Sequence, residues 1–145
     1  INSLINWETA VGAVGYALSQ QNQSGYAVQI IPPVESAFVA AAGLIAICVA
    51  EAVASIAALT GAWRMWRRRA QDSLAFTSAK QPAILGAGIA VLIWFLGFQV
   101  IGGAAIMMGQ ADGMDGAMRG SFTFGSYSFL SLIYLSLNEA PQPDP

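Results

Sequence analysis

Glu51 and Gln99 are the two side chains of this chain with the clearest potential for chemistry, because each lies deep inside a long apolar stretch. A group of this kind at such a depth hydrogen-bonds to a neighbouring helix or belongs to an ion or proton pathway. Counted from the ends of their stretches, the two lie within about 6 Å of each other in depth. We therefore expect a polar pair. A neutral, hydrogen-bonded Glu51 is one interpretation, and a proton relay, quinone contact or ion site is the other.

The remaining sequence offers few groups for catalysis. It contains no histidine, the commonest protein ligand of metals. Its single cysteine, Cys48, lies in an apolar stretch, so no disulfide can form within the chain. General acid–base chemistry therefore has few candidate residues. The sequence predicts a protein that is not an enzyme, with no catalytic residues, no metal ligands and no cofactor.

The most apolar segment of the chain is 83–108, which carries no charged residue. About 20 apolar residues in a helix cross a hydrocarbon core about 30 Å thick. The whole chain is 56% hydrophobic and only 10% charged, whereas soluble domains are about 25% charged. The sequence therefore predicts an integral membrane protein with a transmembrane helix over 83–108.

Two further stretches, 34–62 and 121–137, are predicted to cross the membrane. The first follows two prolines, which commonly open helices, and its Glu51 makes it dependent on neighbouring helices. The second alternates polar and apolar residues between 121 and 128, a strand-like period. A transmembrane barrel needs that alternation in every segment, and the other two stretches lack it. The predicted fold class is therefore all-α, a polytopic transmembrane helix bundle that forms a single membrane domain over 1–145.

A short amphipathic helix is predicted over 5–20, before the first span. Asn6 is its candidate N-cap, and one face carries Trp7, Val11, Val14 and Leu18. This helix packs on the outer face of the protein or lies in the membrane interface. The lack of Lys and Arg in this region disfavours the interfacial position. The polar, proline-rich segment 138–145 is expected to be a disordered tail.

Small residues predict where helices pack closely in the membrane. In 34–62, alanine recurs at every fourth position along one ridge: Ala42, Ala46, Ala50, Ala54, Ala58 and Ala62. In 83–108, the corresponding residues are Gly97, Gly102 and Gly103. Either set would let another helix approach closely, and the paired glycines would also permit a kink.

Basic residues are concentrated between the first two predicted spans. Five of the six lie there: Arg64, Arg67, Arg68, Arg69 and Lys80. The segment 64–82 is predicted to be a loop between these spans, and the positive-inside rule places it and the C-terminus in the cytoplasm. Residues 1–33 and the loop 109–120 are then outside. We expect the arginines to contact anionic lipid headgroups and not nucleic acid.

The central span resembles a bacterial family of predicted small integral membrane proteins of unknown function. Its most specific part is Trp94-Phe95-x-Gly97-Phe98-x-Val100-Ile101-Gly102-Gly103, followed by Met108 and Gln110. The resemblance extends over 2–137 and includes Gly61-Ala62-Trp63-Arg64 and Ala79-Lys80. It implies four helices in the natural protein, one of them before Asn2, and it matches Glu51 to the intramembrane acid of the family. Where the family has an acid after the paired glycines, this chain has Ala104.

These observations together predict a non-catalytic accessory subunit of the bacterial inner (cytoplasmic) membrane. It would pack against a larger respiratory or photosynthetic complex, and its partners would be membrane lipids and the integral membrane subunits of that complex. The alternative is a small transporter or proton-handling protein that uses Glu51 and Gln99. Replacing Glu51 by Gln distinguishes the two hypotheses. It would abolish a measurable flux if the protein is a transporter, and it would alter assembly little if the protein is a subunit.

Overall fold

The computed structural model describes residues 2–21 and 31–137, and these two ranges consist of helices joined by short connections. In chain order the elements are α1 (Asn2–Ile5), α2 (Trp7–Ser19), α3 (Ala37–Arg68), α4 (Ser73–Val91), η1 (Leu92–Ala105), η2 (Met108–Gln110) and α5 (Asp115–Ser136). No strand occurs in the described part of the chain. The predicted all-α class is confirmed.

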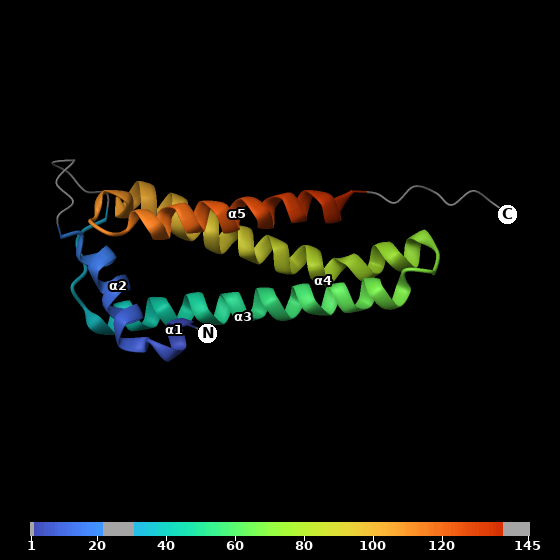
Figure 1. The fold of residues 1–145 in the computed structure, drawn as a ribbon, viewed down its shortest axis with the longest axis horizontal. Coiled ribbons are helices and arrows are strands. Elements are labelled where there is room, and N and C mark those ends of the chain that lie inside the picture. The colour runs from blue at the N-terminus through green and yellow to red at the C-terminus, as the bar shows by residue number, and fades with distance from the viewer. Residues whose placement is uncertain (1, 22–30, 138–145) are drawn as a thin grey trace.

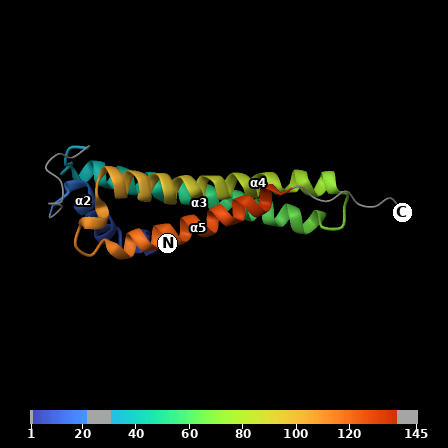
Figure 2. The same cartoon turned by 90° about the horizontal axis from the view of Figure 1, so that it is seen from above.

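The described chain has three long helical segments, and they form an elongated bundle (Figure 1). They are α3, the continuous helix made of α4 and η1, and α5. The α4–η1 helix runs antiparallel to α3 and carries α5 along its other side. Figure 2 shows α2 lying across one end of the bundle, where α3 begins and η1 ends. The turn between α3 and α4 lies at the opposite end.

Two helices of the described chain, Ala37–Arg68 and Ser73–Ala105, are long and apolar enough to cross a membrane. Large hydrophobic side chains remain exposed along them, and Phe38 and Leu74 are each 82% exposed. Exposed apolar surface of this extent is typical of a membrane contact. The third span remains a prediction: α5 is 22 residues long but more polar.

The connection 64–82 was expected to be a loop, and this is wrong over most of its length. Helix α3 continues to Arg68, and α4 begins at Ser73, so only 69–72 lie between helices. Asp72 caps α4, because its side chain accepts a hydrogen bond of 2.6 Å from the backbone N–H of Ala75. Arginine and lysine favour helices. The charges therefore mark where the apolar stretch ends, and not where the helix ends.

The other predicted boundaries shift by smaller amounts. Helix α3 begins at Ala37 because Ser36 is its N-cap, and its hydroxyl accepts from Val39 N–H. Helix α5 begins at Asp115 and not at 121, so the predicted loop 109–120 is mainly η2 and the first turns of α5. Helix α2 lies within the predicted 5–20 and has Asn6 at the N-cap position. The predicted tail 138–145 lies outside the described residues.

The central span contains an unexpected helix type. From Leu92 to Ala105 the backbone is a π-helix, and the next amide continues its pattern, since Ile106 N–H donates to Ile101 C=O at 2.9 Å. Long π-helices are rare, and short ones often occur at functional sites. Gly97 and Gly102, five residues apart, lie close together here, and a Cβ at Gly102 would be 3.5 Å from the Gly97 carbonyl oxygen.

Candidate functional site

The closest approach between helices in the bundle is that of α3 and α4. A Cβ added at Gly86 would lie 2.6 Å from the Ala54 carbonyl oxygen and 2.7 Å from the Ala58 nitrogen. A Cβ at Gly61 would overlap Ala83 in the same way. The predicted packing residues Ala54 and Ala58 therefore lie at a helix crossing, as expected for small residues in a membrane.

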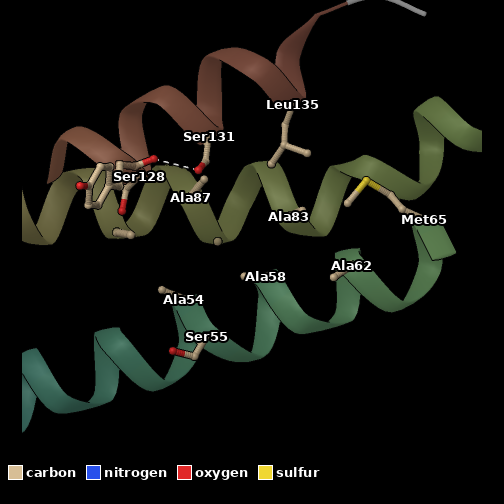
Figure 3. A pocket seen from close by; sticks show the side chains of 13 residues that line it. Ala54, Ser55, Ala58, Ala62, Met65, Ala83, Ala87, Ser128, Ser131 and Leu135 are labelled. Carbon is tan, nitrogen blue, oxygen red and sulfur yellow. Dashed lines mark hydrogen bonds between the residues drawn. The ribbon is translucent and has the colours of Figure 1, made fainter. Parts of the chain in front are cut away.

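A groove opens beside this crossing, between α3, α4 and α5, and its volume is about 430 Å³ (Figure 3). Its lining is mostly alanine, glycine and serine. Helix α3 contributes residues from Ala54 to Met65 and α4 contributes residues from Ala83 to Ala90. Helix α5 adds the hydroxyls of Ser128 and Ser131. Along α3 the groove extends for about 17 Å. We call this surface the small-residue groove.

Gln99 lies on η1 and hydrogen-bonds to α5. Its side-chain nitrogen donates to the Met118 carbonyl at 2.9 Å and to the Ser121 hydroxyl at 2.6 Å. Ser121 is 1% exposed and donates in turn to the Met118 carbonyl. These bonds join η1 to the beginning of α5. The sequence placed Gln99 deep in a span and expected Glu51 as its partner, whereas its partners in the structure are Met118 and Ser121.

Glu51 lies half-buried on α3, and among the described residues no hydrogen bond joins it to Gln99. It follows Ile47 and precedes Ser55 in a row of every fourth residue, so it lies between the small-residue groove and an apolar cavity nearer α2. Because no hydrogen bond joins Glu51 and Gln99, the predicted polar pair is not formed in the described structure. As a separate point, no group of three or more Cys, Asp or Glu side chains that could hold a metal ion occurs in 2–21 and 31–137.

The aromatic residues of the central span pack against α5. Trp94 stacks on Phe98 with ring centroids 5.1 Å apart and lies 5.4 Å from Phe124. Phe95 meets Phe122 edge to face at 6.1 Å. A Cβ at Gly125 would be 3.1 Å from the Phe95 ring, so this glycine makes room for the ring.

Lys80 has a structural role that the sequence interpretation missed. The sequence interpretation treated it as a basic residue of the predicted loop and as part of the family resemblance, but it lies on α4 and is 6% exposed. Its ammonium group donates to the Leu137 carbonyl at 3.1 Å and lies 5.6 Å from the Phe76 ring. A cation is favourable at a helix C-terminus. Lys80 therefore stabilises the end of α5 against α4.

The arginines predicted to contact lipid headgroups lie at the end of the bundle that contains the turn between α3 and α4. Arg68 donates to the Ser78 hydroxyl at 2.9 Å, across the turn between α3 and α4. Arg69 donates to the Trp66 carbonyl and lies 4.3 Å above the Trp66 ring. Arg64 and Arg67 are exposed. Arg68 and Arg69 therefore help to shape this end of the bundle, and headgroup contact stays a prediction.

The other predicted packing residues lie near α2. Ala46, Ala50, Gly97 and Gly102 line an apolar cavity of about 550 Å³ between α3 and η1. Gly103 faces α5, and a Cβ there would lie 2.9 Å from the Met118 methyl group. The small residues near α2 thus border a cavity, whereas those near Gly86 form a close crossing.

A family model of predicted small integral membrane proteins (DUF2165) matches residues 1–138. Neither a curated protein nor a solved structure matches the chain. The match covers both helices that are apolar enough to span a membrane, as well as the groove, the cavity and the contacts of η1 with α5. The chain therefore belongs to this family of predicted small integral membrane proteins, the kind of family that its central span indicated.

Proposed function

We propose that this protein is a non-catalytic accessory subunit that packs against a transmembrane helix of a larger inner-membrane complex. The observation that carries the proposal is the small-residue groove. Alanine and serine side chains such as Ala62 and Ser131 remain exposed there, directly beside a crossing where alanine and glycine bring α3 and α4 together.

The chemistry of the groove suits a helix. Lipid tails are as apolar as leucine, so membrane helices associate through close packing and interhelical hydrogen bonds, and small residues and serines are enriched where they meet. Ala58 and Ala62 offer short side chains on one wall of the groove. Ser131 donates to the Tyr127 carbonyl at 2.8 Å, and its oxygen can still accept a bond from a partner.

The proposed orientation follows from the basic residues. Arg64, Arg67, Arg68 and Arg69 lie at the end of the bundle that contains the groove. By the positive-inside rule, this end is cytoplasmic and α2 lies outside. In this arrangement α5 is the third span, and the partner helix contacts the cytoplasmic half of the bundle.

The transport alternative relied on Glu51 acting with Gln99. The Gln99 side-chain nitrogen is bonded to Met118 and Ser121, and among the described residues no second polar side chain is joined to Glu51. The subunit function is therefore the one that the arrangement favours.

The test is purification of the chain from its own membrane in a mild detergent, with mass spectrometry of the subunits that accompany it. Ala62→Leu and Ser131→Leu place a larger side chain in the groove. Ala52→Leu makes the same change at an exposed position of α3 outside it. We expect one integral membrane subunit to be recovered stoichiometrically with the wild type and with Ala52→Leu. The groove variants should lose it by about tenfold, or about 1.4 kcal/mol of binding free energy.

Two results would contradict the proposal. One is a clean homo-oligomer with no accompanying subunit, which would direct attention to Glu51 and transport. The other is equal recovery of the same subunit with Ala62→Leu and with Ala52→Leu, which would place the partner on a different surface.

A further inference from the structure

The apolar cavity near α2, which we call the α2 cavity, lies in the half of the bundle that does not contain the small-residue groove. It has a volume of about 550 Å³, within the range of about 300–1,000 Å³ that is usual for ligand sites. Helix α2 contributes Val14 and Leu18, α3 contributes Ile47, and η1 contributes Phe98. Helix α2 lies across this end of the bundle (Figure 2), and its residues Val14 and Leu18 form one wall of the cavity.

The lining of the α2 cavity contains no charged or hydrogen-bonding side chain. A ligand with a polar group inside it would lose hydrogen bonds to water without replacing them. A hydrocarbon chain loses none. The cavity also differs from the small-residue groove, since it has no serine to bond with a helix and its walls include valine, leucine, isoleucine, phenylalanine and methionine.

The dimensions of the α2 cavity match one leaflet of a bilayer. Along α3 its lining extends from Val39 to Ala50, which is about 17 Å of helix. One half of a hydrocarbon core about 30 Å thick is about 15 Å. A single acyl chain of the adjacent leaflet therefore has the length needed to fill the cavity.

The charges at this end of the bundle select the headgroup. Glu35 lies four residues before Val39, just ahead of α3, and Asp115 follows Met114, so acidic residues flank the lining of the cavity in the sequence. Glu8 and Asp112 add further carboxylates in the adjoining segments, and Arg119 is the basic residue of the same region. This surface repels an anionic headgroup and attracts an ammonium group.

We propose that the α2 cavity holds one acyl chain of a phosphatidylethanolamine molecule from the leaflet on the α2 side. Its ammonium group lies toward the carboxylates at this end. The site is separate from the small-residue groove and does not depend on the proposed subunit function.

The experiment uses the purified, delipidated full chain in detergent, with added phosphatidylethanolamine and native mass spectrometry to count the phospholipid retained. We expect one molecule per chain. Ala46→Phe fills the cavity, and Ala50→Leu is a milder version of the same change. Ala42→Phe is the matched control, because Ala42 is exposed on α3 and does not line the cavity. The cavity variants should retain at least about tenfold less lipid, corresponding to lost burial of about two methylene groups.

Phosphatidylglycerol in place of phosphatidylethanolamine tests the headgroup, and it should be retained less well. Circular dichroism of each variant shows that it is folded, and Ala50→Leu decides the result if Ala46→Phe unfolds. Equal retention by the cavity variants and Ala42→Phe would overturn the site. Equal retention of both lipids would overturn the headgroup assignment.

Discussion

At the scale of single residues, the two polar side chains inside the spans have different environments. Gln99 bonds to Met118 and Ser121 on α5, whereas Glu51 lies half-buried on α3 without a bond to Gln99 in the described structure. The sequence placed both residues deep inside apolar stretches, and how deep they lie in the membrane stays a prediction. It did not predict the partner of Gln99, because counting depth does not show which face of η1 a side chain occupies.

Gln99→Leu tests the role of this residue in stability. The change removes two hydrogen bonds between η1 and α5, and interhelical hydrogen bonds in membranes contribute about 0.6 kcal/mol each on average. We expect the free energy of unfolding in detergent to fall by about 1–2 kcal/mol. Gln110→Leu, at an exposed position of η2, should leave it nearly unchanged. A coupling energy between Glu51→Gln and Gln99→Leu would show instead that the two residues do interact.

At the scale of helices, the apolar stretches predicted that helices exist but not where they end. Lys80 and the four arginines between 64 and 69 suggested a loop. In the structure, however, α3 continues to Arg68 and Lys80 lies on α4, so most of this segment is helical. Capping by Asp72 decides the start of α4, and this local bond is independent of hydropathy. The π-helix was not predictable in the same way, because the apolar pattern of 92–105 is equally compatible with an α-helix.

Gly86→Leu tests the crossing of α3 and α4. A side chain at Gly86 would press against the backbone of α3 at Ala54 and Ala58, and overpacking of this kind usually costs about 1–3 kcal/mol. Gly88→Leu is the matched control, because a Cβ there meets no atom within 4 Å and the gain in helix propensity is similar. We expect Gly86→Leu to have the lower thermal midpoint in detergent. Equal midpoints would mean that the crossing is looser than the structure shows.

At the scale of the whole molecule, the two halves of the bundle have different surfaces. The half near the α3–α4 turn contains the small-residue groove, and the half near α2 contains the apolar cavity. Composition and hydropathy predicted the membrane class and the all-α fold. The groove depends on how α3, α4 and α5 are arranged in three dimensions, and the cavity depends on how α2 and η1 lie against α3. The alanine ridge therefore indicated close packing but not which of its members would remain uncovered.

The most direct test of the proposed subunit function is site-specific photo-crosslinking in intact membranes. A photoreactive amino acid replaces Ala58, which lines the groove, and in a second variant it replaces Leu59, which is 71% exposed and lies outside the groove. We predict a discrete adduct from Ala58 with one transmembrane segment of another protein, and only lipid adducts from Leu59. Lipid adducts alone from both positions, or an adduct with a second copy of this chain, would contradict the account.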